Sequence, residues 1–293
     1  MTATVPGLRP AGAAASTGPV EGLVQWLKDL WNTRELTANL VRRDLKVRHR
    51  GSFLGMLWSL TTPLLIVGLY YFVFTYIFRQ SLVDDVPRPD GNQVPFAIYF
   101  FSGLTLWNLF SSSVGASTNS VIHSGYLLNK VYFPRAILPI STVLSSLVTF
   151  GFEVAVLLVA SLAVVGLPSP HLLWAPVIVA IVVVFAIGLS LLLSAVTVFL
   201  RDTAHFIAVF MQLWFWGTPV IYSLGIVDDR PGLLTLLKLN PLTGAVVSFR
   251  NVVILNHAPS FTLLAYDAVA AVVTLLVGGW VFQRWQRVFS EMV

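Results

Sequence analysis

Long apolar stretches recur along the chain, separated by short polar segments. A helix needs about 20 apolar residues to cross about 30 Å of hydrocarbon. Six stretches reach that length, at residues 57–78, 94–118, 136–165, 172–200, 206–226 and 263–283. The pattern therefore predicts an all-α membrane protein with six transmembrane helices.

Two shorter patterns predict helices that do not cross the membrane. Gly22–Trp31 places its leucines and tryptophans on one stripe, which is typical of an amphipathic helix in the interface. After the fifth span, Asn240-Pro241 opens an apolar run through Leu255. Asn before Pro is a common start of a helix. This run carries Arg250, and we expect it to form a re-entrant outer hairpin between helices 5 and 6.

The basic residues predict the orientation of the spans. With the N-terminus inside, 13 lysines and arginines fall inside and 5 outside. The positive-inside rule therefore predicts that both termini are cytoplasmic. Residues 1–20 are rich in Thr, Ala, Pro, Gly and Ser and predict a disordered cytoplasmic tail. Residues 21–293 form a single predicted transmembrane domain.

Composition narrows the functional classes. Charged residues make up 11% of the chain, against about 25% in soluble domains. The formal net charge of +5 comes from cations at the ends of spans, which favours a membrane surface over nucleic acid. There are no cysteines, so disulfides and thiol nucleophiles are excluded. No G-x-x-x-x-G-K-[ST] loop is present, so ATP-driven transport would need a separate ATPase chain.

Several ordered motifs carry a resemblance to a known family. They are Arg43–Trp58 leading to Pro63-Leu64, Lys130–Arg135 with Leu138-Pro139, Phe199–Asp202, Thr218–Tyr222 and Asn240–Thr243. Together they span nearly the whole folded chain. The chain resembles the membrane (permease) subunit of type-2 ABC exporters, in the branch that exports O-antigen, teichoic acid and capsular polysaccharide.

The resemblance implies a function and an assembly. It implies a homodimeric channel for a lipid-linked polysaccharide in the bacterial plasma membrane, with two copies of a cytoplasmic ABC ATPase subunit. The permease itself would be no enzyme and would bind no cofactor, because ATP is used by the partner. Which polysaccharide is exported stays open.

Two basic or aromatic segments are candidate sites on the cytoplasmic side. A cation cluster is expected at the cytoplasmic gate, where it meets a lipid-linked headgroup or docks the ATPase. Attraction to anionic lipid is the alternative. The resemblance makes the loop between the second and third spans the ATPase coupling element, with a plain linker as the alternative. The gate residues are Arg42, Arg43, Lys46, Arg48 and Arg50, and the coupling residues are His123, Tyr126, Lys130, Tyr132, Phe133 and Arg135.

The resemblance implies that the first and fifth spans line the channel, so aromatic side chains on these spans are candidates for the substrate path. Their faces can stack on sugar rings without sequence preference. An aromatic belt at the membrane interface is the alternative for most of them. The candidate residues are Tyr70, Tyr71, Phe74, Trp214, Trp216 and Tyr222.

Other polar and helix-breaking positions have open interpretations. Glu153 lies mid-way along the third span and is either a functional or a structural acid. We favour the structural interpretation, in which Glu153 is hydrogen-bonded to Ser145, Ser146 or Thr149. Asp267 is expected near the outer end of the sixth span, within reach of water. Gly217-Thr218-Pro219 predicts a kink in the fifth span, as a simple bend or an outer gate.

Three rival functions remain. One is a type-2 ABC exporter of drugs or small lipids. Another is a membrane glycosyltransferase that uses the paired acids Asp84-Asp85 and Asp228-Asp229, although acidic pairs in loops are usually solvated. The third is a secondary transporter with Glu153 as its proton site, for which the expected repeats of broken helices are missing from the sequence.

Overall fold

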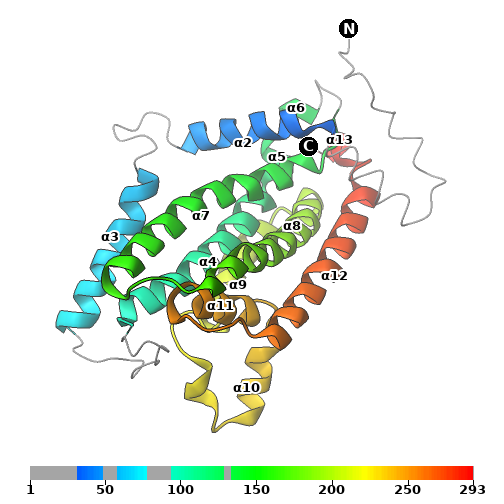
Figure 1. Ribbon diagram of the computed structural model, residues 1–293. Helices are drawn as coiled ribbons and strands as arrows, with labels where there is room; N and C mark the ends of the chain where they lie inside the picture. The colour runs from blue at the N-terminus through cyan, green and yellow to red at the C-terminus, as the bar shows by residue number, and fades with distance from the viewer. Residues whose placement is uncertain (1–31, 49–57, 78–93, 129–132, 293) are drawn as a thin grey trace.

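The computed structural model describes residues 32–48, 58–77, 94–128 and 133–292. Within these ranges the chain is all-helical and contains no strand (Figure 1). The long helices form one bundle, and α2 (Arg34–Arg48) lies across one end of it. A bent helix pair that starts with α10 (Pro231–Lys238) lies at the opposite end. The two ends of the bundle are called the α2 end and the α10 end.

The helices occupy the six stretches predicted from the sequence. They are α3 (Trp58–Phe72) with a π turn η2 (Val73–Ile77), α4 (Phe96–Thr118), α7 (Ile137–Val164), α8 (Ala175–Phe199), α9 (Thr203–Trp216) and α12 (Phe261–Trp285). Shorter elements are α5 (Ser120–His123), α6 (Gly125–Leu128), η3 (Pro170–Trp174), η4 (Leu224–Val227) and α13 (Phe289–Met292).

Within the described residues, three helical segments are long and apolar enough to cross a membrane by themselves. They are Ile137–Ala163, Pro170–Phe199 and Phe261–Trp285. A further pair, α10 (Pro231–Lys238) and Thr243–Leu255, is bent by 90° at its break, as a broken span or a re-entrant loop would be. The second segment of the pair consists of α11 (Thr243–Arg250) and a π turn η5 (Asn251–Leu255). Multiple apolar helices therefore make the chain a multi-pass membrane protein.

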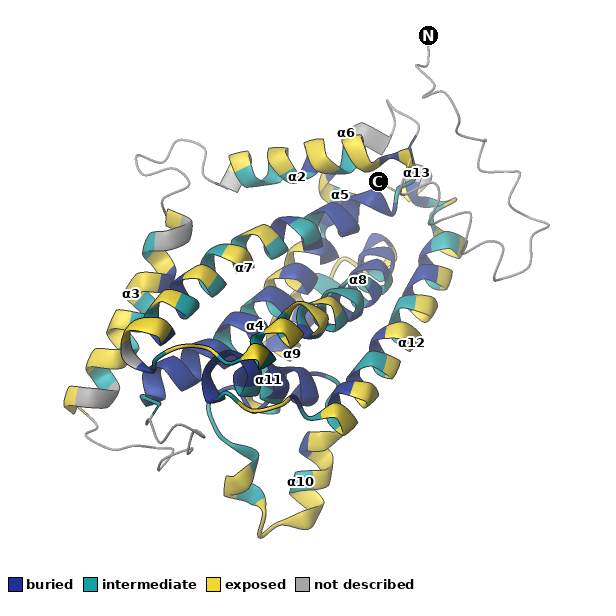
Figure 2. Cartoon of the chain, viewed as in Figure 1, coloured by how far each residue is buried: buried dark blue, intermediate teal, exposed yellow. Residues whose placement is uncertain are grey.

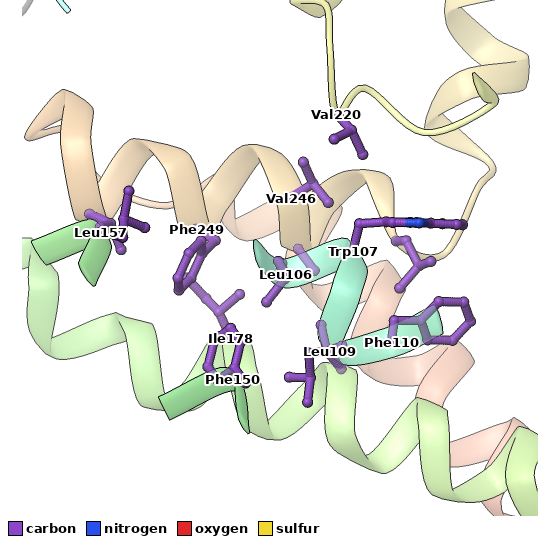
Figure 3. Packing of buried hydrophobic residues seen from close by; sticks show 14 of the residues in the cluster. Leu106, Trp107, Leu109, Phe110, Phe150, Leu157, Ile178, Val220, Val246 and Phe249 are labelled. Atoms are coloured by element: carbon purple, nitrogen blue, oxygen red, sulfur yellow. The ribbon is translucent and has the colours of Figure 1, made fainter. Parts of the chain in front are cut away.

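Helix α4 is the centre of the bundle. It packs against α7, α8, α9, α3 and α11, and 17 of its 23 residues are buried. Figure 3 shows its Leu106, Trp107, Leu109 and Phe110 among side chains of neighbouring elements, such as Phe150 of α7 and Ile178 of α8. Because protein rather than lipid surrounds most of α4, this helix tolerates more polar residues than a lipid-facing span.

Several hydroxyl groups on α4 are satisfied inside the bundle, whereas the buried Ser113 hydroxyl has no hydrogen-bond partner among the described residues. Ser102 and Thr105 donate to backbone carbonyls one turn back, at 2.7 and 2.8 Å. Ser117 donates to the Ser190 hydroxyl of α8 at 2.6 Å. Such interhelical bonds contribute modestly in membranes, on the order of 1 kcal/mol each.

The fifth predicted span ends earlier than expected. Helix α9 stops at Trp216, and turns follow through Gly217-Thr218-Pro219. The prediction of a kink within a longer helix is therefore wrong. Proline has no amide hydrogen, and here it lies beyond the helix rather than inside it.

The entrance to the bent pair also differs in detail. Helix α10 was not predicted, and α11 begins at Thr243 rather than at Pro241. Asn240 instead closes the turn between the two helices, because its Oδ1 accepts from the Leu242 amide at 3.1 Å.

The predicted interface helix Gly22–Trp31 lies outside the described residues. The neighbouring α2 packs Leu36 and Leu40 against Phe133 and the start of α7, and exposes its other face (Figure 2).

Helices α8 and α12 approach one another closely at a pair of glycines. A methyl group on Gly278 would collide with the backbone carbonyl of Gly188. We predict that Gly278→Ala lowers the free energy of unfolding by about 1–3 kcal/mol, since overpacking displaces backbone. Thermal unfolding of the purified protein in detergent measures the change.

Gly279→Ala is the matched control, because a methyl group there has no atom within 4 Å. Equal melting temperatures for the two variants would contradict the close α8–α12 contact.

Candidate functional site

A buried arginine joins three parts of the chain at the α10 end. Arg250, the last residue of α11, is 2% exposed. Its Nη1 donates to the Tyr99 hydroxyl of α4 at 2.7 Å and to the Pro219 carbonyl at 3.2 Å. Its Nη2 donates to the Val220 carbonyl at 2.8 Å. The guanidinium therefore fixes the segment after α9 between α4 and α11.

The surroundings of Arg250 are shaped for a guanidinium. Its Cζ lies 3.6 Å from the centroid of the Tyr99 ring, within the range of a cation–π contact. A methyl group on Gly103 would lie 2.5 Å from Nη2, so glycine leaves room for the cation. The only ion pair among the described residues, Arg43–Asp44, lies elsewhere. Carbonyl and hydroxyl oxygens thus take the place of a carboxylate partner.

An aspartate holds the other end of α11. Asp267 of α12 is 1% exposed, and its Oδ2 accepts from the Ala245 amide in the first turn of α11 at 2.6 Å. The expectation that Asp267 reaches water is wrong. The Asp267 carboxyl group therefore holds the first turn of α11, and the Arg250 guanidinium holds its last residue. Hydrogen bonds from two buried side chains thus fix the orientation of α11.

Asn240 fastens the end of α9 to the bent pair. Its side-chain amide donates to the Gly217 carbonyl at 2.9 Å and to the Thr218 hydroxyl at 2.8 Å, and its Oδ1 accepts from Trp214 Nε1 at 3.0 Å. Sequence reasoning treated Asn240 as a cap alone. Both Asn240 and Arg250 could have been recognised from the sequence as buried hydrogen-bonding residues, because each lies in an otherwise apolar run.

The path candidates separate into exposed and packed side chains. Tyr71 on α3 is 43% exposed and Trp216 on α9 is 63% exposed. Tyr70 packs edge-on against Phe100, with centroids 4.5 Å apart. Trp214 packs against Phe110 and Phe185 and is correspondingly less available to a substrate.

Two path candidates remain. Tyr222 donates its hydroxyl to the Trp216 carbonyl at 3.0 Å, and thus lies beside the exposed end of α9. The Phe74 backbone belongs to η2, but its side chain lies outside the described part of the structure.

Helix α2 carries most of the predicted gate cations. Arg42, Arg43 and Lys46 are exposed, and Arg43 forms an ion pair of 3.0 Å with Asp44. The Arg48 side chain and Arg50 lie outside the described residues. The structure thus places three cations on the solvent-facing side of a helix that packs on α7.

The coupling candidates do not form one exposed patch. His123 of α5 is exposed, and Tyr126 of α6 is 70% exposed. Phe133 is 8% exposed and packs in the cluster with Leu40 of α2, so its side chain is not on the exposed surface that a docking partner would need. Arg135 donates to the Gln286 carbonyl at the end of α12. Lys130 and Tyr132 lie outside the described residues.

Glu153 forms a bond between helices. Its Oε2 accepts from Asn108 Nδ2 of α4 at 3.4 Å. Ser145, Ser146 and Thr149, the partners expected from the sequence, donate instead to carbonyls of their own helix. The structural reading of Glu153 therefore holds with a different partner.

The described residues hold no candidate metal site. They contain no group of three His, Asp or Glu side chains that could hold a metal ion. Asp228 and Asp229 are exposed after η4, and Asp84-Asp85 lie outside the described residues. In the part of the chain that the structure describes, most buried hydroxyls donate to carbonyls of their own helix. Ser117, Arg250 and Asp267 are buried side chains that join different elements.

Comparison with known proteins identifies the class. Residues 35–254 match the ABC-2 type transporter family. The chain belongs to this family, and it is a transmembrane permease subunit of an ABC-2 exporter rather than an enzyme.

Curated relatives cover nearly the whole chain. An O-antigen export system permease protein RfbA of Myxococcus xanthus is 32% identical over 271 residues, which cover 92% of this chain and all of the relative. Two proteins of the same name from Klebsiella pneumoniae are 29% and 27% identical, each over 88% of this chain and 95% of the relative.

The buried guanidinium yields a stability prediction. Arg250→Met removes three donated hydrogen bonds and leaves buried carbonyls unpaired, so we expect a loss of about 3 kcal/mol in the free energy of unfolding. Arg284→Met removes the same charge from an exposed position on α12 and is the control. Thermal unfolding of both variants measures the difference. An Arg250→Met protein as stable as the control would refute the role of the cluster.

Proposed function

We propose that this permease forms the conduit of an ATP-driven exporter of lipid-linked polysaccharide, such as O-antigen or a similar cell-envelope glycan, in the bacterial plasma membrane. The observation that carries the proposal is the match over about nine tenths of the chain to proteins named O-antigen export permeases. Two copies of the chain would enclose the path, since one bundle of this size has a packed centre.

Exposed aromatic side chains support a sugar cargo. Tyr71 of α3 and Trp216 of α9 present large apolar faces outside the packed core. Sugar rings have C–H faces that pack on aromatic planes, and such contacts let a polymer slide because they need no fixed register. Helices α3 and α9 are accordingly the proposed walls of the path.

Cations on α2 support an anionic lipid headgroup. In the proposed orientation the α2 end faces the cytoplasm, where the cargo is made. Arginine binds phosphate oxygens through paired hydrogen bonds, and the exposed Arg42 is free of the ion pair that engages Arg43. The phosphates that link glycan and lipid would meet this surface first.

A separate ATPase would drive the cycle from the same side. His123 and Tyr126 are exposed on α5 and α6, where a partner can reach them. Phe133 and Arg135 follow in the same connection. Phe133 packs against α2, and Arg135 donates to the Gln286 carbonyl at the end of α12. A push on α5 and α6 would therefore reach both the headgroup surface and the last long helix.

The aromatic path yields an export prediction. Trp216→Ala should reduce the amount of glycan that reaches the cell surface, since it removes an apolar face from the path. Trp280→Ala is the matched control, because Trp280 of α12 is 62% exposed against 63% for Trp216. Export is measured by surface staining of glycan in cells that depend on this permease. Equal export by the two variants would favour the alternative exporter of drugs or small lipids.

The coupling surface yields a binding prediction. Tyr126→Ala should weaken co-purification of a co-expressed ABC ATPase subunit from the same organism. Leu173→Ala, at an 81% exposed position in η3 near the α10 end, should leave it unchanged. The amount of ATPase recovered per permease is the measurement. Full recovery with Tyr126→Ala would rule out α6 as the docking surface.

A further inference from the structure

One face of α4 carries polar residues and is not covered by the core of the bundle. In a membrane protein, an uncovered helix face would usually be apolar. The half of α4 nearer the α2 end carries Asn108 and Ser112, and Asn119, the residue that caps the helix, continues the same spacing. Gly115 lies between Ser112 and Asn119. Ser112 and Gly115 are exposed, and Asn108 and Asn119 are half-buried. A methyl group on Gly115 would have no atom within 4 Å, so open space adjoins this face.

Helix α7 extends the polar face. Glu153 accepts the hydrogen bond from Asn108, and Thr149 lies one turn nearer the α2 end. Glu153 and Thr149 are both half-buried. Amide, hydroxyl and carboxyl groups thus come together from two helices along one side of the bundle. We name Asn108 and Ser112 of α4, its cap residue Asn119, and Thr149 and Glu153 of α7 the polar face.

Lipid does not suit the polar face as a solvent. The hydroxyls of Ser112 and Thr149 donate to carbonyls of their own helices. The amides of Asn108 and Asn119 have further donors and acceptors, and leaving such groups unpaired in hydrocarbon costs several kcal/mol. Elsewhere on α7 the exposed side chains are apolar, with Val148, Val159 and Leu162 between 41% and 69% exposed. The same helix therefore presents apolar groups on one side and hydrogen-bonding groups on the other, as expected when water wets only the second.

We propose that the polar face is a hydrated binding surface for the hydroxyl-rich sugar part of the cargo, reaching from the α2 end to the depth of Glu153. The inference rests on the proposed function, and it adds a sugar-binding surface distinct from the aromatic side chains of α3 and α9. Hydroxyls and amides both donate and accept, so they exchange partners with sugar hydroxyls and water.

The position of the polar face suits an early step of transport. Helix α2 crosses the same end of the bundle and packs on α7, with its cations exposed (Figure 1). A phosphate held at α2 would leave the attached sugars next to α4. The uncharged amides and hydroxyls of α4 can then bind successive sugars without holding any of them tightly.

Thiol labelling tests whether the polar face is hydrated. The chain has no cysteine, so single-cysteine variants need no prior replacement. Ser112→Cys lies six residues before the end of α4, and the control Val277→Cys lies eight before the end of α12 at a 48% exposed apolar position. The probe is a membrane-impermeant charged maleimide added to the cytoplasmic side of inside-out vesicles.

We expect Ser112→Cys to be labelled at least about tenfold faster than Val277→Cys, because the reactive thiolate forms in water and not in lipid. Equal slow labelling would overturn the proposal. So would efficient oxidative cross-linking of Ser112→Cys between two copies, since the polar face would then be a subunit interface.

Export measurements test the binding of sugar separately. Ser112→Leu combined with Asn119→Leu makes the polar face apolar without touching the Asn108–Glu153 bond. Surface glycan should be lost with this variant and retained with Val277→Leu, at equal amounts of protein in the membrane. Retained export by the double variant would overturn the sugar-binding role even if the labelling succeeds.

The two measurements also separate this inference from the proposed function. If the chain exports no glycan at all, export fails for the unaltered protein, while the labelling result stands and still reports on hydration. If the chain exports glycan, only the double variant loses it.

Discussion

The guanidinium of Arg250 is the contact on which the arrangement of the α10 end depends. It gathers the Tyr99 hydroxyl and the carbonyls of Pro219 and Val220 around one buried cation. Buried carbonyls need donors, and the broken end of α9 has no further helical turn to supply them. Gly103 on α4 leaves the necessary space. Arg250 thus lets an interrupted helix and a bent helix pair remain inside an apolar bundle.

Helix α11 is held by hydrogen bonds to buried side chains at both ends, and this has a consequence for transport. Asp267 accepts from its first turn while Arg250 closes its last, so the helix is tied to α12, α4 and the segment after α9. These ties position Trp216 and Tyr222 at the rim of the proposed path. At the α2 end, by contrast, Arg135 and Phe133 connect the proposed docking region to α12 and α2. The two ends are joined by the long helices between them.

Sequence periodicity was sufficient for the class and the approximate positions of the long helices. Runs of apolar residues report on burial in lipid or protein alike, so α7, α8 and α12 were found with nearly correct bounds. The same signal cannot show which neighbour a polar group meets. Asp267 was expected in water because it lies near a helix end, yet α11 folds back and covers it. Glu153 found its partner 45 positions away in the sequence, which no local pattern encodes.

The candidate site was predicted less completely than the fold. The cations Arg42, Arg43 and Lys46 on α2 and the side chain of Trp216 are exposed, and their roles stay predictions. Phe133 and Trp214 were chosen as aromatic residues in suitable segments, but both pack against other helices. Aromatic side chains serve cores and binding surfaces equally well, so residue type alone does not separate the two uses. The polar face of α4 was missed because its residues are scattered through an otherwise apolar helix.

Reconstitution tests the central claim most directly. The purified permease and its ATPase subunit would be placed in vesicles together with a lipid-linked glycan on the ATPase side, and glycan in the lumen would be measured. The account predicts that glycan accumulates only when both proteins and hydrolysable ATP are present. Transfer by the permease alone, or an ATP-driven transfer that is confined to small lipids, would contradict it.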